Sequence, residues 1–307
     1  MNWKHKAALQ LVFSTLPLGE RLNYLFQRHI KRSLPLDGAH LAHSTSLAEL
    51  HASLLKRHWG GQLENATFYE FGAGWELSIP LTLYSLGINR QVIADIRPLL
   101  RIELVNDVIA KLQIRASGGT FVRTPAKLLA NGRDGLSMLK NYYGIDYLAP
   151  RDARRTGLPS ASVDCITSTA VLEHIPPVEI RAILQECRRI LRDNGVISLR
   201  IDYQDHYSYF DPHISAYNFL RYPDRVWRFF SPSLHYQNRL RHKDYVRLIV
   251  EADFEIVDEQ CLAGSEADLK ALETLPLDRR FNSYTLPELA VRASNLVLCK
   301  KQIITKQ

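Results

Sequence analysis

Apolar residues recur with a helical period in the first 61 residues of the chain. The stretches that show the three-to-four-residue spacing of an amphipathic helix are residues 9–16, 22–30 and 46–59. A Pro-Leu-Gly sequence follows the first stretch, and Gly60-Gly61 ends the last one. We therefore expect an N-terminal helical extension over residues 1–61.

Short apolar runs alternate with helical stretches in the rest of the chain. The runs cover residues 66–71, 91–95, 145–149, 162–168 and 196–201, and two further runs cover residues 254–260 and 295–300. Helical spacing is found between them, over residues 77–85, 99–114, 177–192 and 242–252. Strands that alternate with helices form a parallel sheet covered on both faces. The pattern predicts an α/β domain over residues 62–307.

Two segments interrupt this alternation. Residues 125–141 lie before the third run, and nothing in them indicates a particular chemistry. Residues 203–241 follow the fifth run and contain eleven aromatic residues, five Arg and three Asp. Aromatic faces and forked Arg donors suit a sugar or ring that carries a carboxylate or phosphate, and the alternative is that most of the rings form a small core of the insert itself. We expect residues 203–241 to form a cap insert over the sheet.

A glycine-containing turn follows the first apolar run. Gly72-Ala73-Gly74 lacks two side chains, so a ligand can lie directly against its backbone amides. The next run ends at Asp95, 21 residues after Gly74, where a carboxylate can bind the two hydroxyls of a ribose. Leu77 stands where a dinucleotide fingerprint needs a third Gly or Ala, and no P-loop sequence occurs. The pattern predicts a nucleoside-like cofactor and disfavours NAD.

The turn resembles motif I of the class I S-adenosylmethionine-dependent methyltransferases, Glu-x-Gly-x-Gly, here Glu70–Gly74. Later segments resemble further elements of this family in the same order: Asp152-Ala153 with Leu158-Pro159, the strand over residues 162–168, Leu172-Glu173-His174-Ile175, and the helix end, Gly turn and strand over residues 191–201. Glu76 departs from the pattern, because many relatives carry a third glycine there. The resemblance, to the methyltransferase type 11-like domain in particular, implies a Rossmann-like doubly wound seven-stranded sheet with an antiparallel last strand.

The same resemblance implies S-adenosyl-L-methionine as the cofactor. Gly72 and Gly74 are implied to make the close turn, Glu70 to support the amino-acid end of the cofactor, and Asp95 to bind the ribose. Asp152 and Ala153 are implied to frame the adenine. The full set of expected cofactor-binding residues is Glu70, Gly72, Ala73, Gly74, Asp95, Ile96, Asp152, Ala153 and Thr169.

Three residues beyond the fourth and fifth strands are candidates for catalysis. Methyl transfer to an oxygen usually needs a general base within hydrogen-bond reach of the acceptor. His174 follows the fourth strand, and Asp202 and His206 follow the fifth, so all three are expected at the ligand-binding edge of the sheet. A structural role for His174 is an equal alternative. Glu173, His174 and Asp202 could also bind a metal ion, but neighbouring residues on a loop are weak support, and we expect no required metal.

Composition limits the partners of the protein. The 307 residues have a formal net charge of +7, and residues 1–60 contain eight Lys and Arg against three Asp and Glu. This basic segment fits a solvated helical face or a weak peripheral association with an anionic membrane surface. No nucleic-acid-binding pattern occurs, so no nucleic acid is expected. Four widely spaced cysteines and the lack of a signal peptide or membrane-length apolar run predict a cytoplasmic protein.

The sequence as a whole predicts an S-adenosylmethionine-dependent methyltransferase. We expect O-methylation of a saccharide or another small polar acceptor, from the composition of the cap insert. One alternative is methylation of a nitrogen or carbon on a lipid or quinone-like acceptor. The other is a non-catalytic binding protein with the same fold, although a scaffold has no need for a ribose-binding carboxylate. The acceptor and the oligomeric state are not determined by the sequence.

Overall fold

A seven-stranded sheet forms the centre of the protein in the computed structural model, which describes residues 2–30, 33–115 and 121–302. The strands are β1 (Thr67–Phe71), β2 (Arg90–Ala94), β3 (Ile145–Leu148), β4 (Val163–Thr169), β5 (Leu191–Asp202), β6 (Phe254–Leu262) and β7 (Ala293–Lys300). Their order across the sheet is β3-β2-β1-β4-β5-β7-β6. Neighbouring strands among β3, β2, β1, β4 and β5 are parallel. Strand β7 is antiparallel to both of its neighbours, β5 and β6. The expected doubly wound sheet with an antiparallel last strand is confirmed.

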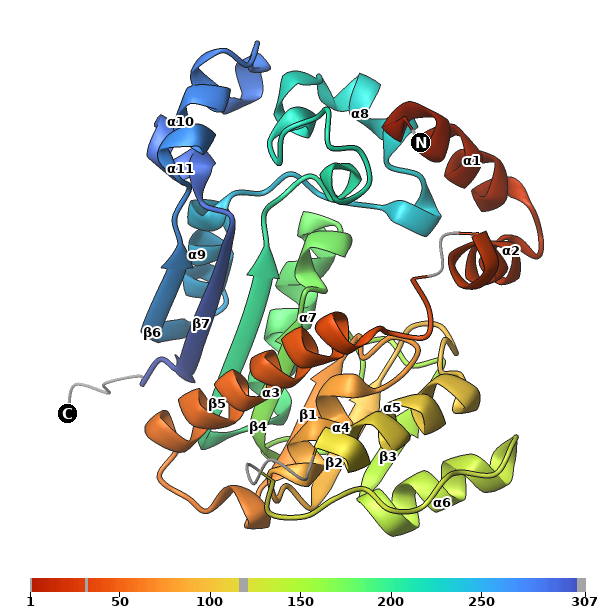
Figure 1. The fold of residues 1–307 in the computed structure, drawn as a ribbon. Helices are drawn as coiled ribbons and strands as arrows, with labels where there is room; N and C mark the ends of the chain where they lie inside the picture. The colour runs from red at the N-terminus through yellow and green to blue at the C-terminus, as the bar shows by residue number, and fades with distance from the viewer. Residues whose placement is uncertain (1, 31–32, 116–120, 303–307) are drawn as a thin grey trace, which may run out of the picture.

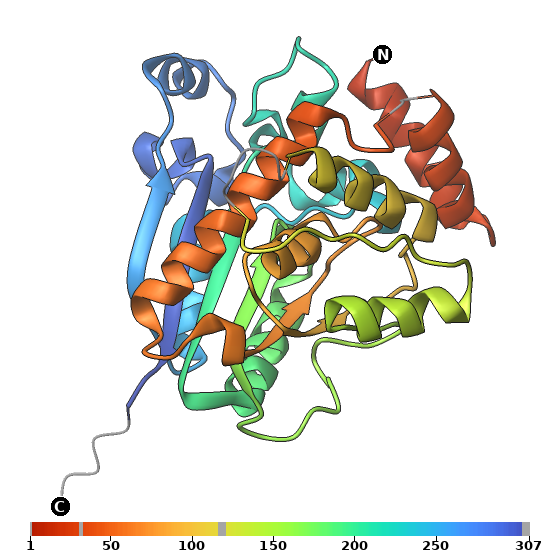
Figure 2. The ribbon, with the colours of Figure 1, turned by 60° about the horizontal axis from the view of Figure 1, so that its bottom comes forward.

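Helices cover both faces of this sheet (Figure 1 and Figure 2). The helices of the chain are α1 (Trp3–Thr15), α2 (Gly19–Leu25), α3 (Gly38–His58), α4 (Ser78–Ser85), α5 (Ile102–Arg115), α6 (Arg133–Tyr143), α7 (Pro177–Ile190), α8 (Asp224–Phe230), α9 (His242–Glu251), α10 (Glu266–Glu273) and α11 (Leu286–Ala290). Helices α3, α4 and α5 lie on one face, and α7 and α9 lie on the other.

Several helices differ in extent from the sequence-based predictions, and three of these differences have a bearing on the fold. The predicted helix over residues 99–114 begins only at Ile102, because the Arg101 amide bonds to the Trp75 carbonyl and holds the preceding residues in a loop. Residues 125–141, for which the sequence indicated no particular chemistry, contain most of α6. The third N-terminal helix begins at Gly38 rather than near residue 46, since the Asp37 side chain caps it by accepting from the His40 amide.

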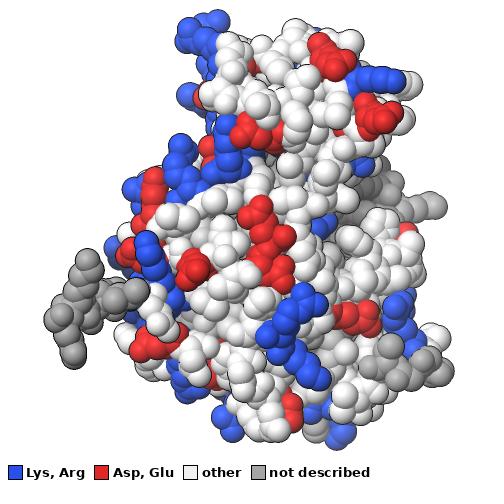
Figure 3. Space-filling view, turned by 90° about the vertical axis from the view of Figure 1, so that its left-hand side faces the viewer, with Lys and Arg blue, Asp and Glu red and all other residues white. Residues whose placement is uncertain are grey.

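The core consists of the central strands and the helices packed on them. In β4, six consecutive residues are buried, as expected for a strand covered on both faces. Residues from β1, β4 and β5 pack with α7 and α9 in one cluster that includes Tyr69, Ile166 and Ile201. The outer strand β6 alternates half-buried and exposed positions after the buried Phe254, and it carries charged residues. Figure 3 shows Lys and Arg interspersed with Asp and Glu on this side of the molecule.

Helix α3 is attached to the sheet by a buried histidine. His51 is 3% exposed, and its ring nitrogens lie 2.7 Å from the Ser198 hydroxyl and 3.0 Å from the Thr169 hydroxyl. Burial lowers the pKa of His51 to about 4. The ring is therefore neutral near pH 7, with one nitrogen donating and the other accepting. Its hydroxyl partners on β4 and β5 connect α3 to the middle of the sheet.

The cap over the carboxyl ends of the strands combines three distant parts of the chain (Figure 1). One buried cluster contains Trp3 and Ala7 from α1, Tyr207, Tyr217, Phe219, Leu220 and Trp227 from the cap insert, and Leu272, Phe281, Leu289 and Ala290 from the segment between β6 and β7. The Trp3 amide donates to the Asp211 carboxylate at 3.0 Å, and the Trp3 ring lies 4.8 Å from that of Phe230. Helix α1 is thus part of the cap, whereas α3 packs on the sheet.

Two arginines of the cap insert have structural partners. Arg241 is fully buried, and its guanidinium donates to the backbone carbonyls of Tyr203, Leu289 and Val291. Arg239, 2% exposed, donates to the Phe219 and Tyr222 carbonyls and to Asp224. The expectation that the cap arginines pair with an acidic substrate is therefore wrong for these two, because buried carbonyls require their donors.

No helix in the described parts of the chain is long and apolar enough to cross a membrane.

Candidate functional site

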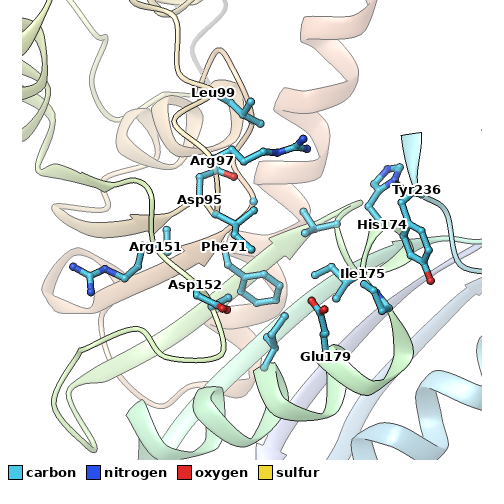
Figure 4. A pocket seen from close by; sticks show the side chains of 18 of the residues that line it. Phe71, Asp95, Arg97, Leu99, Arg151, Asp152, His174, Ile175, Glu179 and Tyr236 are labelled. Atoms are coloured by element: carbon cyan, nitrogen blue, oxygen red, sulfur yellow. Dashed lines mark hydrogen bonds between the residues drawn. The ribbon is translucent and has the colours of Figure 1, made fainter. Parts of the chain in front are cut away.

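A cavity of about 390 Å³ opens at the carboxyl ends of β1, β2 and β4. Its lining comes from the loops after these strands and after β3, from the first half of α7 and from residues 233–236 of the cap insert. Figure 4 shows Asp95 and Asp152 on one side of the cavity and His174 and Tyr236 on the other. The loops that follow parallel strands meet at this edge of the sheet, where ligands bind in folds of this type.

The glycine turn forms one wall of the cavity. Gly72 and Gly74 both have positive φ, +80° and +75°, which side chains rarely tolerate. A Cβ on Gly72 would lie 2.6 Å from the Val171 methyl groups, so the absence of a side chain allows the two loops to pack. A Cβ on Gly74 would meet nothing within 4 Å. Gly74 therefore leaves open space beside the backbone, where a ligand can approach it.

Asp95 follows β2 directly and contributes a buried carboxylate to the lining. It is 6% exposed, and its Oδ2 has no hydrogen-bond partner among the described residues. Burial raises the pKa of Asp95 to about 7, although the Gly74 amide, Arg97 and Tyr147 act in the opposite direction. A buried acceptor without a donor is costly, so this oxygen is suited to a ligand that brings hydroxyl groups.

Asp152 and Ala153 line the cavity on the loop after β3. The Asp152 carboxylate already accepts from the Arg154 backbone amide at 2.8 Å and from its guanidinium at 2.6 Å. The hydrogen bonds from Arg154 lower the pKa of Asp152. Asp152 is therefore ionised and oriented, and it retains acceptor capacity because a carboxylate has about four lone-pair sites.

The structure places the expected cofactor-binding residues in two groups. Gly72, Gly74, Asp95, Ile96, Asp152 and Ala153 line the cavity, whereas Glu70, Ala73 and Thr169 do not. Glu70 is buried behind the turn and accepts from the Thr167 hydroxyl at 3.2 Å, and burial raises its pKa to about 8. The Thr169 hydroxyl bonds to His51 on the α3 side of the sheet, and Ala170 lines the cavity instead.

A second cavity of about 260 Å³ adjoins the first one. It shares His174, Leu234 and His235 with the first cavity. Its other lining residues are Lys6, Gln10, Asn23, Phe26 and Gln27 from the N-terminal helices, and His206, Tyr209 and Phe210 from the cap insert. The two compartments meet at His174, so a ligand in each would meet beside this ring.

His174 lines both cavities. Its Nδ1 lies 2.8 Å from the Tyr236 backbone oxygen, which can only accept, so Nδ1 carries the proton and Nε2 has the lone pair. Desolvation of the ring by the residues around it lowers the pKa of His174 to about 4, and the neighbouring His206 makes a smaller contribution in the same direction. His174 is therefore neutral at pH 7 and able to accept a hydrogen bond at Nε2.

Asp202 and His206 lie together on the other side of His174. The His206 Nε2 is 3.3 Å from the Asp202 Oδ2, and the His206 ring lies 4.8 Å from the His174 ring. Tyr209 stacks on His206 and donates its hydroxyl to Asp202. Burial alone would raise the pKa of Asp202, but His206 and Tyr209 bring it down to about 2. The fold thus brings together all three residues that the sequence indicated for catalysis.

The neighbouring Glu173 is a buried carboxyl of a different kind. It is 2% exposed, and neither of its oxygens has a hydrogen-bond partner within the described ranges. Burial, and then the negative charge of Asp202, raises its pKa well above the usual value. Potential metal-ligating atoms of Glu173, His174 and His206 lie within 4.8 Å of one another. These three residues are the set near the cavities that could hold a metal ion, whereas the sequence had suggested Asp202 in place of His206.

Several lining residues could not be found from the sequence. Lys6 and Gln10 come from α1, about 200 residues away from the histidines that they face across the second cavity. Val171 and Tyr236 act through their positions, as the neighbour of Gly72 and as the acceptor for His174. The buried face of α1 consists of Trp3, Lys6, Ala7 and Gln10 and is half polar, so no apolar pattern in the sequence indicates which side of this helix packs.

Comparison with known proteins gives one family match. Residues 130–199 match the model of a family described as methyltransferase domain. Among solved structures, a 1,6-didemethyltoxoflavin-N1-methyltransferase from Burkholderia thailandensis, with bound 1,6-didemethyltoxoflavin and S-adenosylhomocysteine, aligns with a TM-score of 0.47 and 11% identity over 92% of this chain and 88% of that one. A putative sarcosine dimethylglycine methyltransferase from Galdieria sulphuraria gives 0.46 and 14% over 83% and 86%. The curated proteins contain no match.

Proposed function

We propose that this chain, which carries a class I S-adenosylmethionine-dependent methyltransferase domain, methylates an oxygen of a saccharide or another small polar acceptor. The first cavity would hold the cofactor and the second the acceptor. When bound, the cofactor supplies a methyl group on a positively charged sulfur, which is strongly electrophilic. The protein then needs to bind, orient and deprotonate the acceptor.

The observation that carries this proposal is the Oδ2 of Asp95, which has no hydrogen-bond partner in the part of the chain that the structure describes. It is buried in the wall of the cavity, at the end of β2 and beside the glycine turn. The two hydroxyls of a ribose are the donors that such an oxygen lacks. The open space over Gly74 and the oriented carboxylate of Asp152 suit the rest of an adenosyl group. The residues present therefore fit the cofactor of this family.

We infer that His206, with Asp202, acts as the general base. Nε2 of His206 lies 3.3 Å from Asp202 Oδ2 but makes no hydrogen bond within the described residues, and a small rotation of the ring would let it donate its proton to this carboxylate and leave the lone pair on Nδ1. A proton from the acceptor hydroxyl moves to Nδ1, and the ionised Asp202 stabilises the imidazolium that forms. His174, fixed by the Tyr236 carbonyl, presents Nε2 as an acceptor for a different donor group of the acceptor molecule, which orients that molecule. The cofactor, held by residues of the first cavity such as Asp95 and Asp152, would supply the methyl group to the deprotonated oxygen.

Cofactor binding tests the first part of this proposal. Calorimetry should detect S-adenosylhomocysteine binding to the wild-type protein, and Asp95→Ala should weaken it about tenfold to hundredfold, the loss expected for one or two hydrogen bonds to a charged group. Mass spectrometry of the purified protein should find the cofactor or its product. Failure of the wild type to bind S-adenosylhomocysteine would favour the alternative, a binding protein with a methyltransferase fold.

The chemistry of the acceptor is tested separately. Turnover with candidate acceptors should fall strongly in His206→Gln and survive treatment with EDTA, because the proposed proton transfer uses His206 and Asp202 alone. Unchanged turnover in both His174→Gln and His206→Gln would favour a nitrogen or carbon acceptor instead. Loss of turnover with EDTA and its recovery with a divalent cation would indicate that Glu173, His174 and His206 bind a metal.

Location and surface contacts are a further part of the proposal. The four cysteines are free thiols, which supports a reducing, cytoplasmic location. The corner between α1 and α2 exposes the aliphatic side chains of Leu11, Val12, Leu16 and Leu18. Exposed apolar side chains in a basic segment support weak binding to an anionic membrane surface.

A further inference from the structure

Another group of metal-ligating side chains lies outside both cavities, between α9 and the outer strand β6 (Figure 1). His242 is the first residue of α9. Glu259 and Cys261 lie two residues apart on β6, so their side chains point to the same face of the strand. None of the three residues lines either cavity. An imidazole, a carboxylate and a thiol thus meet at a place that the proposed reaction does not use.

The three ligand atoms are spaced as a zinc ion requires. His242 Nε2 lies 2.9 Å from Glu259 Oε1 and 3.6 Å from Cys261 Sγ, and Cys261 Sγ lies 3.7 Å from Glu259 Oε1. A tetrahedral Zn²⁺, with bonds of about 2.3 Å to sulfur and about 2.0–2.2 Å to nitrogen and oxygen, holds such atoms about 3.3–3.6 Å apart. The observed triangle is therefore within a few tenths of an ångström of a zinc site.

The His242 ring is oriented by a buried hydroxyl. Its Nδ1 lies 3.3 Å from the Tyr203 hydroxyl, which lies 2.6 Å from the Ser294 hydroxyl. The Tyr203 hydroxyl can accept from Nδ1 and donate to Ser294, which leaves Nε2 for a metal. A histidine that binds a metal almost always has such a partner on its other nitrogen, because this partner fixes the tautomer and the orientation of the ring.

The chemistry of the three ligands favours Zn²⁺ over the divalent ions that bind oxygen alone. A thiolate and a carboxylate carry two negative charges, which balance the charge of the ion. Burial, and then the charge of Glu259, raise the pKa of the Cys261 thiol to about 11, so the ion displaces the thiol proton when it binds. Sulfur and imidazole ligands suit Zn²⁺, whereas Mg²⁺ and Ca²⁺ prefer oxygen.

From this geometry we propose that His242, Glu259 and Cys261 bind one Zn²⁺ ion, which attaches the outer strand β6 to the start of α9. The exposed side chains of Glu259 and Cys261 leave the fourth ligand position to water. Strand β6 is at the edge of the sheet, so a metal bond to α9 adds an attachment beyond its pairing with β7. The ion is not part of the reaction, and this inference does not depend on the proposed function.

The test uses the full chain, treated with EDTA, dialysed, and then titrated with Co²⁺ or Zn²⁺. Co²⁺ should give the absorption of a tetrahedral site with a thiolate-to-metal band, and about one equivalent of Zn²⁺ should abolish this absorption. Zn²⁺ should raise the temperature of unfolding, and Ca²⁺ should not. Cys261→Ser should remove the thiolate band, and His242→Gln should weaken Zn²⁺ binding by at least about tenfold.

His58→Gln is the matched control. His58 pairs with Asp258 on the opposite face of β6, also at 2.9 Å, but the described residues place no third ligand atom beside this pair. This variant should bind Zn²⁺ like the wild type. Cys261→Asp guards against a defect in folding, because it keeps a ligand atom: it should bind Zn²⁺ more tightly than Cys261→Ser and still lack the thiolate band.

The inference is overturned if Co²⁺ gives no thiolate band, if Cys261→Ser and His242→Gln bind Zn²⁺ like the wild type, or if His58→Gln weakens binding equally. It is also overturned if Zn²⁺ binding is lost in His206→Gln and kept in His242→Gln. The ion would then lie at Glu173, His174 and His206.

Discussion

The Nε2 of His206 lies 3.3 Å from the Oδ2 of Asp202, four residues before it in the chain. His206 lines the second cavity together with His174, and a carboxylate beside a histidine is the usual arrangement for a general base. The geometry leads to a first prediction about turnover.

His206→Gln and Asp202→Asn should reduce kcat by about a hundredfold to ten-thousandfold, the usual contribution of general acid–base catalysis. The KM for the cofactor should change little, because neither residue lines the first cavity. His242→Gln is the matched control: His242 pairs with Glu259 at 2.9 Å but lines neither cavity, so its loss should leave kcat intact. Equal losses in all three variants would contradict a specific role for His206.

The affinity for S-adenosylhomocysteine should rise with pH around neutrality. The pKa of Asp95 is raised to about 7 by burial, so the carboxyl is largely protonated at pH 6 and largely ionised at pH 8. Ribose hydroxyls donate more strongly to the ionised form, so binding releases a proton. Calorimetry from pH 6 to pH 8 should show a falling Kd in the wild type. In Asp95→Asn the curve should be flatter, and two parallel curves would exclude Asp95 as the titrating group.

Gly74→Ala should weaken cofactor binding beyond its effect on stability. The positive φ of Gly74 strains any side chain, by about 1–2 kcal/mol, and the new methyl group enters the space over the turn. Gly132→Ala is the control, because Gly132 has a similar φ of +71° and equally open surroundings outside both cavities. Chemical denaturation should show a loss of stability in both variants. Only Gly74→Ala should lose affinity for S-adenosylhomocysteine.

Protonation of His51 should make the protein less stable in mild acid. In the folded state the pKa of His51 is lowered to about 4, whereas in the unfolded chain it is about 6.5. The unfolded state therefore binds the proton more readily between these values, and stability falls as the pH falls from about 6.5 to 4. The contribution is of the order of a few kcal/mol.

The measurement is the free energy of unfolding of the wild type and of His51→Gln as a function of pH. Asp95 and Glu70, whose pKa values are raised, contribute with the opposite sign in both proteins, so the difference between the two curves isolates His51. This difference should shrink toward pH 4. A constant difference would mean that His51 does not titrate as its burial implies.

Binding to anionic vesicles should depend on the corner between α1 and α2. Leu16 and Leu18 are 43% and 61% exposed, so Leu16→Gln with Leu18→Gln should reduce flotation with phosphatidylserine-containing vesicles without unfolding the protein. Val178→Gln and Val250→Gln, also exposed but on other helices, are the control. Deleting residues 1–60 is unsuitable, since this removes α3 from the sheet. Equal flotation of both double variants would show that Leu16 and Leu18, at the corner between α1 and α2, do not contribute to vesicle binding.

The sequence by itself determined the sheet and most of the first cavity. Alternating apolar runs and helical stretches identify strands and helices, and local order places Gly72, Gly74, Asp95 and Asp152 just beyond strand ends. Parallel strands bring their carboxyl ends to one edge, so residues at such positions converge whatever the loops contain. This regularity is why His174, Asp202 and His206 could be expected at the same edge.

The tertiary structure alone decided which side chains reach the cavities. Thr169 and Glu70 are next in the sequence to residues that line the first cavity, but they do not line it themselves. The Thr169 hydroxyl bonds to His51, and Glu70 lies behind the glycine turn, where it bonds to Thr167. In the sequence Arg241 is a candidate for binding a ligand, but in the structure its guanidinium donates to buried backbone carbonyls. Lys6 enters the second cavity because α1 packs on the cap insert, through contacts between residues about 200 positions apart. Such pairings depend on side-chain packing between distant segments, and no local pattern encodes them.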